Sequence, residues 1–494
     1  MSERNYWFTV PLVRALAALG VRHACVTPGS RSTPLALALA REPGITDWPH
    51  LDERSSAFFA LGLARATGFP VMAACTSGTA AAEFLPAAVE ARNARVPLIL
   101  VTADRPADLL GVGAPQTIDQ AGLFGVAAKW SLDLEPPPPG EAAPGFAAAL
   151  AARLVAFALD SPPGPVHLNL RFREPLVPEG PWPSEPVAVP GILPGRVMPA
   201  ADAVVRLADL ASGRRGLLVC GPQDDPALPA AAAACAAALG WPILADPLSG
   251  ARAGSHDLNR VIAAGDPLAA AGWLGQAPPE VVVRVGALPT SKPLWQWLSG
   301  HPEVPQVLID PAGWRDPGAT LTLAVRADPA ATLKALAAAA PRSAPAAWLE
   351  AWLRANGAAA AALDGVLEDV PFPNEPGVVR VLADALPAGA LLAVASSMPI
   401  RDVDAFLPAR PSPLRLLGNR GAAGIDGFLS TGFGAAAAHP GPACLLTGDL
   451  SALQGLLAAG SLARQGPFDV MHCPFGSIAN MAVSAVYFVW GWTN

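Results

Sequence analysis

Short runs of continuous apolar residues, separated by alanine-rich amphipathic segments, recur along this chain in three groups. Continuous rather than alternating apolar runs are typical of parallel strands covered on both faces. The segments between them, such as 53–66 and 79–93, have helical patterning, so the pattern predicts βαβ units. The runs of the first group are 23–29, 71–78, 97–104 and 165–170.

Proline-rich stretches separate the groups. Residues 134–145 are expected to form a loop and 176–199 a linker between domains, because consecutive prolines remove backbone donors and fix φ. A further alanine- and proline-rich link lies near 337–347. The later strand runs are 216–221, 241–246, 280–286 and 306–310, with a helix over 228–239, and then 391–397 and 443–449. We therefore expect an α/β protein of three successive parallel-sheet domains, at residues 1–180, 195–340 and 346–494.

Charge and cysteine usage exclude several classes of protein. The net charge is −7, and no basic stripe suggests a nucleic-acid partner. The six cysteines are scattered in apolar stretches without a CxxC pair, which is typical of reduced core residues in a cytosolic protein. The N-terminus has no signal-peptide pattern, and no apolar run reaches the roughly 20 residues that a membrane span needs. A cytoplasmic location with no membrane partner is expected. The cysteines are Cys25, Cys75, Cys220, Cys235, Cys444 and Cys473.

Polar clusters follow three strand runs of the first group. "TPGSRSTP" carries Ser30 and Arg31, "TSGTAAAEF" carries Thr76 and Gly78, and "TADRP" carries Arg105. Ligands of open parallel sheets bind beyond the carboxyl ends of the strands, so these clusters predict a site for carboxylate or phosphate groups. The alternative is ordinary turn chemistry, since any βα loop uses Gly, Pro, Ser and Asp.

Two stretches of the third group carry further chemistry. In "LLTGDLSAL", Gly448 and Asp449 end a strand, and this carboxylate could ligate Mg²⁺ while a diphosphate supplies other oxygens. The alternative role of Asp449 is to cap the next helix. Residues 418–436 are rich in glycine around Asn419 and Arg420, which allows the backbone to approach a ligand closely.

Taken together, these stretches resemble the thiamine-diphosphate-dependent enzymes, and within them the synthases that consume isochorismate in menaquinone biosynthesis. The resemblance runs in family order from about residue 5 to 470. It is carried by "PGSRSTPLALAL", "HLDERSSAFFALGLARATG", "CTSGTAAAEFLPAAVEA", "LILVTADRP", "GAPQTIDQ", "NRGAAGIDGFLSTGFGAA" and "GDLSAL".

The resemblance implies that Glu53 is the catalytic acid. In this superfamily a glutamate at that place bonds N1′ of the cofactor's aminopyrimidine, which then takes the proton from the thiazolium C2. An apolar pocket would raise the pKa of such a carboxyl, so that the protonated acid can donate to that nitrogen. The alternative is that Glu53 only stabilises the first turn of a helix through the helix dipole.

The resemblance also implies a division of labour between domains. The first domain would bind the pyrimidine and the third the diphosphate, with each site shared between subunits of a homodimer or a dimer of dimers. The implied reaction decarboxylates 2-oxoglutarate and adds the four-carbon unit to isochorismate, with thiamine diphosphate and Mg²⁺ or Mn²⁺. Cofactor contacts are implied for Glu53, Thr76, Gly78, Ile425, Gly448 and Asp449, with Asp449 as metal ligand. Substrate contacts are implied for Ser30, Arg31, Arg105, Gln116, Lys292, Ser397, Arg401 and Arg420.

Lys292 and Arg401 match less closely, and an exposed solubilising charge is the alternative for both. The match breaks near the end of the chain, because residues 471–494 carry no Asp, Glu, Lys or Arg and no Asn-Asn pair. Asn480 has neither the neighbours nor the spacing of the expected metal ligand. We expect a truncated or frame-shifted third domain with weakened metal and cofactor binding and an unpaired sheet edge.

Two rival functions stay open at this point. One is another thiamine-diphosphate carboligase, such as a relative of acetolactate synthase, which a preference for pyruvate would support. The other is an inactive remnant of the synthase, which detectable decarboxylation would exclude.

Overall fold

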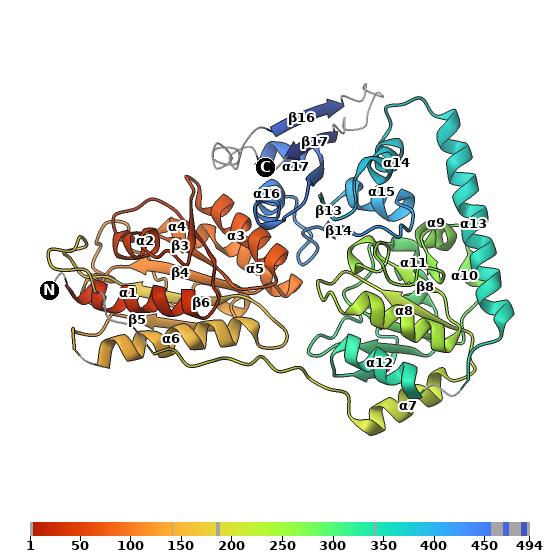
Figure 1. Ribbon diagram of the computed structural model, residues 1–494, viewed down its shortest axis with the longest axis horizontal. Coiled ribbons are helices and arrows are strands. Elements are labelled where there is room, and N and C mark those ends of the chain that lie inside the picture. Colours follow the sequence, from red (N-terminus) through yellow and green to blue (C-terminus); the bar gives the residue numbers. More distant parts are fainter. Residues whose placement is uncertain are drawn as a thin grey trace.

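The computed structural model describes residues 3–140, 142–183, 188–339, 342–455, 468–473 and 486–491. Three sheets follow one another along the chain. Figure 1 shows the first, in red to yellow, on one side, the second, in green, on the other, and the third, in blue, between them at the top of the view. The predicted α/β class is confirmed.

The first sheet has six parallel strands in the order β2-β1-β3-β4-β6-β5. Its central strands are apolar on both faces: Val71 and Ala73 of β3 pack in a core with α3 and α5, and Met72 and Ala74 in a core with α1 and α6. The elements are α1 (Glu3–Ala18), β1 (His23–Val26), α2 (Thr33–Ala40), β2 (Thr46–Pro49), α3 (Glu53–Thr67), β3 (Val71–Cys75), α4 (Thr79–Glu83), α5 (Leu85–Ala94), β4 (Leu98–Asp104), η1 (Ala107–Leu109), η2 (Gly125–Ala127), β5 (Trp130–Leu134), α6 (Ala142–Leu159) and β6 (Val166–Arg171).

Two local predictions differ from this sheet's structure. The expected helix 79–93 is two helices, with Phe84 ending α4 and capping α5. Pro86 in the first turn of α5 has no N–H to continue the earlier ladder. The expected loop 134–145 ends early, because α6 already begins at Ala142.

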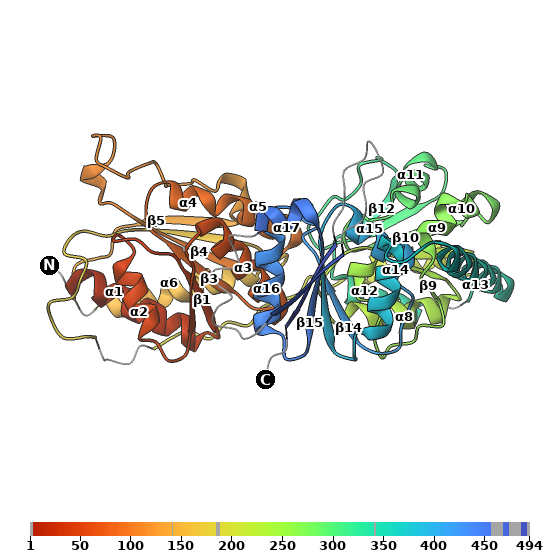
Figure 2. The same ribbon diagram turned by 90° about the horizontal axis from the view of Figure 1, so that it is seen from above.

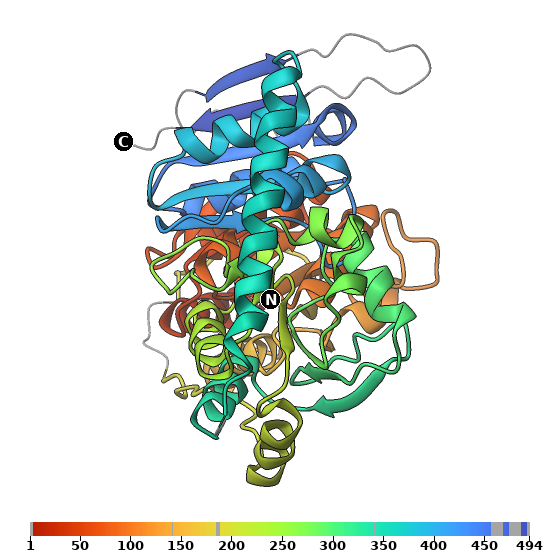
Figure 3. The ribbon, with the colours of Figure 1, turned by 90° about the vertical axis from the view of Figure 1, so that its right-hand side faces the viewer.

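The second sheet also has six parallel strands, in the order β12-β11-β10-β7-β8-β9. The long helix α13, in the foreground of Figure 3, belongs to this unit by packing, since Trp348 and Trp352 lie in the second core. The indole Nε1 of Trp348 donates to the Gly216 carbonyl at 2.9 Å. The elements are α7 (Ala201–Ala211), β7 (Gly216–Cys220), α8 (Leu228–Leu239), β8 (Ile243–Ala245), η3 (Pro247–Ser249), β9 (Val261–Ile262), α9 (Gly265–Ala270), α10 (Trp273–Gln276), β10 (Val281–Val285), α11 (Lys292–Gly300), β11 (Gln306–Ile309), β12 (Leu321–Val325), α12 (Pro329–Ala339) and α13 (Ala346–Asp369).

The third sheet has the order β14-β13-β15-β17-β16. Strands β13, β14 and β15 are parallel, whereas β17 runs antiparallel to both β15 and β16. The predicted parallel sheet is confirmed for β13, β14 and β15. The expected unpaired edge beside β15 is wrong, because β17 hydrogen-bonds along β15. Asn480 lies outside the described residues. The elements are α14 (Glu375–Ala385), β13 (Ala390–Val394), α15 (Met398–Phe406), β14 (Leu414–Leu417), α16 (Phe428–Ala438), β15 (Ala443–Gly448), α17 (Asp449–Gly455), β16 (Phe468–Cys473) and β17 (Val486–Gly491).

The first and third units share one core, in which α3 packs directly on α16 (Figure 2). The helices approach closely because glycines face backbone: a Cβ added at Gly434 would lie 2.0 Å from the Phe59 carbonyl oxygen. Arg65 of α3 then joins all three units, since it pairs with Asp224 at 3.0 Å and donates to the Gly418 carbonyl.

No helix in the described part of the chain has both the length and the apolar character needed to cross a membrane. Five cysteines, all except Cys473, are described as buried free thiols. Burial raises the pKa of the Cys25 and Cys75 thiols well above the ordinary value. These thiols are therefore unreactive, because the thiolate is the nucleophile.

Candidate functional site

The carboxyl ends of three neighbouring strands carry the polar clusters of the first unit. Strands β1, β3 and β4 are parallel neighbours, so the segments that follow them meet at one edge of the sheet. Ser30 and Arg31 follow β1, Thr76 and Gly78 follow β3, and Arg105 follows β4. The structure therefore brings these predicted residues together.

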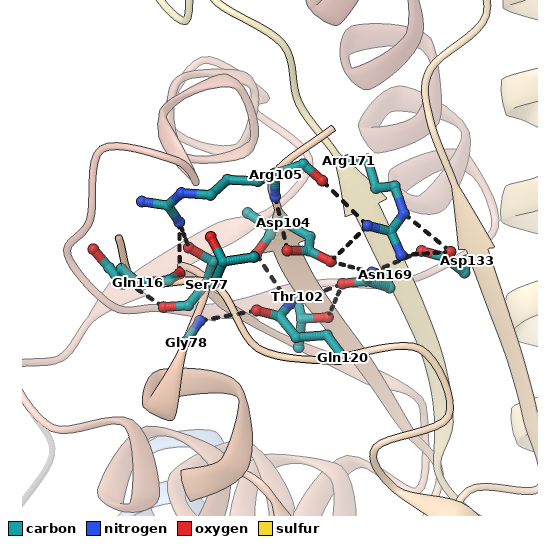
Figure 4. A network of polar contacts seen from close by, with 12 residues as sticks. Ser77, Gly78, Thr102, Asp104, Arg105, Gln116, Gln120, Asp133, Asn169 and Arg171 are labelled. Atoms are coloured by element: carbon teal, nitrogen blue, oxygen red, sulfur yellow. Dashed lines mark hydrogen bonds and ion pairs between the residues drawn. The ribbon is translucent and has the colours of Figure 1, made fainter. Parts of the chain in front are cut away.

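The turn at Ser77 and Gly78 is held by Arg105 and Gln116 (Figure 4). The Arg105 guanidinium donates to the Ser77 hydroxyl and, at 2.7 Å, to the Gln116 carbonyl. The Gln116 side-chain amide donates to the Ser77 carbonyl at 2.9 Å. Gly78 has φ +87°, a conformation that glycine adopts without strain. Two predicted substrate residues are thus fixed against the predicted cofactor turn.

Arg31 and Arg105 form a pair of neighbouring cations. Arg31 donates to the Phe172 carbonyl at 3.0 Å and forms an ion pair with Glu174 at 3.2 Å. Burial lowers the pKa of Arg105, and the charge of Arg31 lowers it further. Because these two guanidinium groups repel each other, an anion that binds between them is stabilised.

Thr76 offers an unused polar group at the same edge. Its hydroxyl is buried and has no hydrogen-bond partner among the described residues. Gly29 lies directly against it, since a Cβ there would be 2.3 Å from Cβ of Thr76. A buried orphan hydroxyl is uncommon in folded proteins, so it fits a bound ligand at this point.

Glu53 opens α3 beside this group. Asp52 caps the helix by accepting the Ser55 N–H at 2.8 Å, which leaves the Glu53 side chain in the first turn and half-buried. Its charge acts on Cys75, as the second cause, after burial, of the raised pKa of that thiol. Glu53 therefore lies near the end of β3, where the cofactor residues follow. The predicted deep burial of this carboxyl is not reached within one chain.

A separate cavity of about 210 Å³ lies in the third unit. Its lining includes four predicted residues: Ser397, Ile425, Gly448 and Asp449. Ser397 precedes α15 with φ +77°, a strained conformation for a residue with a side chain, and backbone strain of this kind clusters at functional sites. The cavity is below the ~300–1,000 Å³ typical of small-molecule sites, so it fits part of a cofactor rather than a whole one.

The charges of this third-unit cavity are all acidic. Glu375, Asp402 and Asp449 line it, and the lining contains no Lys or Arg. Burial, with the Glu375 charge as a second cause, raises the pKa of Asp402 to about 7. An anionic diphosphate would fit such a lining only together with a cation. Among the described residues, no group of three potential ligands could hold a metal by protein atoms alone.

A larger cavity, of about 880 Å³, lies where the three units meet. It contains the three predicted residues Lys292, Arg401 and Arg420, and no carboxylate side chain lines it. Arg95 and Arg315 form ion pairs with Asp310, at 2.7 Å and 3.8 Å, and five further cations line the cavity. Its charge therefore favours an anion, and its volume suits a small molecule. Its cationic lining residues are Arg92, Arg95, Lys129, Lys292, Arg315, Arg401 and Arg420.

Glu90 holds the loop that carries Arg420. This glutamate lies on α5 of the first unit and is only 2% exposed. Its two carboxylate oxygens accept the backbone N–H groups of Gly421 at 2.7 Å and Ala422 at 2.6 Å. No local sequence signal marks Glu90, because its partners are more than 300 residues away.

The predicted residues thus lie in three places: the basic cavity, the third-unit cavity, whose predicted residues we call the third-unit group, and the strand ends of the first unit, whose predicted residues we call the first-unit group (Ser30, Arg31, Glu53, Thr76, Gly78, Arg105 and Gln116). Arg105 comes directly after the last residue of β4, whereas Arg95, which lines the basic cavity, comes before the first residue of this strand. A parallel strand of seven residues is about 23 Å long, so the two arginines lie at opposite ends of β4. Neither cavity described above is lined by Glu53, Thr76 or Arg105. Within the described part of one chain, the first-unit group and the third-unit group therefore do not line a common cavity.

Residues 9–123 match the family model described as thiamine pyrophosphate enzyme, N-terminal TPP binding domain. This range includes the first-unit group, from Ser30 to Gln116.

Relatives match over nearly the whole chain. A protein from Chloroflexus aurantiacus, named 2-succinyl-5-enolpyruvyl-6-hydroxy-3-cyclohexene-1-carboxylate synthase, is 46% identical over 92% of this chain and 79% of its own length. Proteins of the same name from Geobacillus thermodenitrificans and Geobacillus kaustophilus are 45% and 46% identical over 97% and 93% of this chain. The matches cover 83% and 81% of those two relatives.

Proposed function

Because the chain belongs to the family of 2-succinyl-5-enolpyruvyl-6-hydroxy-3-cyclohexene-1-carboxylate synthases, we propose that it decarboxylates 2-oxoglutarate and joins the four-carbon unit to isochorismate. The products are the compound of that name and CO₂, and the pathway is menaquinone biosynthesis. The observation that carries this function is the basic cavity of about 880 Å³, because both substrates bear more than one carboxylate. The names of the relatives do not favour an acetolactate-synthase type of reaction.

Thiamine diphosphate fits the residues of the two groups. Glu53, Thr76 and Gly78 hold the pyrimidine, and the orphan Thr76 hydroxyl supports a ligand there. Ile425, Gly448 and Asp449 hold the rest of the cofactor, which the third-unit cavity supports. When bound, the cofactor supplies the electron sink that a 2-oxo acid needs to lose CO₂. The Glu53 carboxyl would form the hydrogen bond to the pyrimidine nitrogen.

Asp449 would hold Mg²⁺ or Mn²⁺, and the cation would in turn neutralise the cofactor's diphosphate. Magnesium sites of this type use one or two carboxylates together with phosphate oxygens. The acidic lining of the third-unit cavity supports this role, because a cation offsets the negative charge that these carboxyl groups share.

The remaining residues bind and orient the two substrates. Arg31 and Arg105 receive a carboxylate between them, and Ser30 and Gln116 add hydrogen bonds. On the other side, Lys292, Arg401 and Arg420 bind a second set of carboxylates, and Ser397 lies one helical turn before Arg401. Arginine suits this task because its planar fork matches a carboxylate in two hydrogen bonds.

The active assembly is a homodimer or a dimer of dimers in the cytoplasm. The separation of the first-unit group from the basic cavity along β4 supports a site completed by a second copy. The buried free thiols are consistent with a reducing compartment.

The proposal is tested by incubating the purified chain with thiamine diphosphate, Mg²⁺, 2-oxoglutarate and isochorismate, and identifying the product by mass spectrometry. The proposal predicts the named product with 2-oxoglutarate and none with pyruvate. Arg420→Gln should raise KM about 10- to 100-fold, the range for losing a hydrogen bond to a charged group. Arg354→Gln, at an exposed position on α13, is the matched control.

Two results would overturn the proposal. Turnover of pyruvate in preference to 2-oxoglutarate would favour the acetolactate-synthase type. No turnover by folded protein would favour the inactive remnant.

A further inference from the structure

Two fully buried amides, Gln120 and Asn169, lie directly behind the first-unit group, and neither has a role in the proposed function. Both side chains have no exposed surface. Figure 4 shows them between the Ser77–Gly78 turn on one side and the ion pairs of Arg171 on the other. Burying an amide is costly unless its hydrogen bonds are made, so their partners indicate what they do.

Gln120 makes three hydrogen bonds that fix its orientation. Its Oε1 accepts the backbone N–H of Gly78 at 2.8 Å. Its Nε2 donates to the Ala103 carbonyl at 3.2 Å and to Asn169 Oδ1 at 2.9 Å. Rotating the amide by 180° would set a donor against the Gly78 N–H and an acceptor against two oxygens. Only one orientation is therefore compatible with this site.

Asn169 in turn is held by charges. Its Nδ2 donates to Asp104 Oδ2 at 2.9 Å and to Asp133 Oδ1 at 2.7 Å. Arg171 forms ion pairs with these same two carboxylates, at 3.2 Å and 2.8 Å, and donates to the Arg105 carbonyl at 3.2 Å. The two carboxylates and the guanidinium form a rigid base for the amide pair.

The last hydrogen bond of this network is the one that the Gly78 N–H donates to Gln120 Oε1. The turn there is tight, because a Cβ on Gly78 would lie 2.9 Å from Cγ of Gln116. The same turn supplies both Ser77 oxygens that hold Arg105 and Gln116. A shift of Gly78 therefore displaces three residues assigned to cofactor and substrate.

We infer that Gln120 is a positioning residue, which ties the cofactor turn at Gly78 to Asn169. Through Asn169 it holds the turn against Asp104 and Asp133, the two carboxylates that form ion pairs with Arg171. The expected effect of Gln120 on enzyme activity rests on the proposed function. Its role in holding the Ser77–Gly78 turn in place does not depend on activity.

Gln120→Glu and Gln120→Met test this role. The glutamate keeps the acceptor for Gly78 but loses both donors, so it must stay protonated to face the Ala103 and Asn169 oxygens. The methionine removes all three bonds without adding a charge. Gln306→Glu is the matched control, because Gln306 is a fully buried glutamine of the second unit that donates to the Leu298 carbonyl at 2.6 Å.

The first readout is hydrogen–deuterium exchange of the protein without cofactor. In Gln120→Met, peptides covering residues 76–84 should exchange about tenfold faster, the effect of losing roughly one net hydrogen bond on local opening. Peptides covering β7 and α8 should be unchanged, and Gln306→Glu should leave 76–84 unchanged. Unaltered exchange at 76–84 in both Gln120 variants would overturn the inference.

The second readout is the pH profile of kcat/KM, where up to about 100-fold loss is expected from a displacement near 1 Å. Gln120→Glu should lose activity as pH rises, because the new carboxyl is buried against Asn169, whose other side-chain contacts are the carboxylates of Asp104 and Asp133 and the hydroxyl of Thr102. Arg171 and Arg105 are the cations of this network, and His167, bonded to Thr102, is uncharged at neutral pH because burial lowers its pKa to about 4. Wild-type kinetics in both variants, despite faster exchange, would overturn the positioning role. If the unaltered enzyme has no turnover, the proposed function fails, and the exchange result alone decides whether Gln120 holds the turn.

Discussion

Arg31 and Arg105 define the chemistry of the first-unit group at the scale of single residues. Each is tied to backbone oxygens, and each lies in the positive field of the other. Repulsion between fixed like charges is relieved when a carboxylate binds between them, so the fold stores part of the binding preference in advance. Glu53 lies at the same edge of the sheet and supplies the only acid–base function assigned to this group.

Replacing Glu53 by Gln tests that assignment. The amide keeps the size of the side chain but cannot exchange a proton with the pyrimidine, so kcat should fall by about 10²–10⁴. The melting temperature should stay within a few degrees of the wild type. The measurement is steady-state product formation at saturating cofactor.

Asp52→Asn is the matched control for this substitution, since it removes a charge one residue away while asparagine still caps α3. Equal activity of Glu53→Gln and the wild type would contradict the catalytic role.

At the scale of elements, sequence patterns identified the central strands and missed the edges. The predicted runs correspond to β1, β3, β4, β6, β7, β8, β10, β11, β13 and β15, and all ten lie inside their sheets. The missed strands are β2, β5, β9, β12, β14, β16 and β17, and all of them except β17 are sheet edges. An edge strand is covered less completely, so polar residues interrupt its pattern: β5 alternates between exposed and partly buried positions.

The same limit applies to the site. Ser30, Thr76 and Arg105 were predictable because each directly follows a recognisable strand. Asn169 was not, because it lies within the apolar run of β6 and its role depends on partners from β4, β5 and the segment that carries Gln120. Glu90 was hidden for the same reason, since only the folded chain brings α5 to the loop at Gly421.

Glu90→Gln tests how α5 controls that loop. A glutamine can accept only one of the two backbone N–H groups and sets its own donors against the other. We expect a loss of about 1–3 kcal/mol in the free energy of unfolding and a raised KM through misplacement of Arg420.

Denaturant titration and substrate saturation curves measure these two effects. Glu83→Gln, at an exposed position on α4, should change neither. Unchanged stability and KM in Glu90→Gln would show that the loop carrying Arg420 keeps its conformation without Glu90.

At the scale of the whole molecule, buried ionic contacts join the units. Arg252 of the second unit is 1% exposed and donates to Asp404 Oδ1 of the third unit at 2.8 Å. It also donates to the carbonyls of Ala245, Val403 and Leu407. This contact fixes α15, and with it Ser397 and Arg401, relative to the second unit.

The buried contact between Arg252 and Asp404 predicts that the stability of the folded chain depends on pH. Burial raises the pKa of Asp404 to about 7, and the charges of Asp246 and Asp266 add to this while Arg252 opposes it. An unfolded Asp titrates near 3.9. Between about pH 4 and pH 7 the folded chain therefore keeps a proton that the unfolded chain has released, so the free energy of unfolding falls as pH rises across this window.

Chemical denaturation at several pH values measures this slope. Asp404→Asn should flatten it, because the amide cannot titrate, whereas Asp209→Asn, at an exposed position on α7, should leave it unchanged. An identical slope in Asp404→Asn and the wild type would contradict the assignment.

The central claim is that the first-unit and third-unit groups of two copies form one synthase site. Co-expression of Glu53→Gln and Asp449→Asn chains, each inactive alone, tests it by product formation. In mixed dimers one of two sites regains both residues, so the mixture should recover about a quarter of wild-type specific activity. An active wild type with no recovery in the mixture would mean that each site lies within one chain, and an inactive wild type would contradict the synthase function itself.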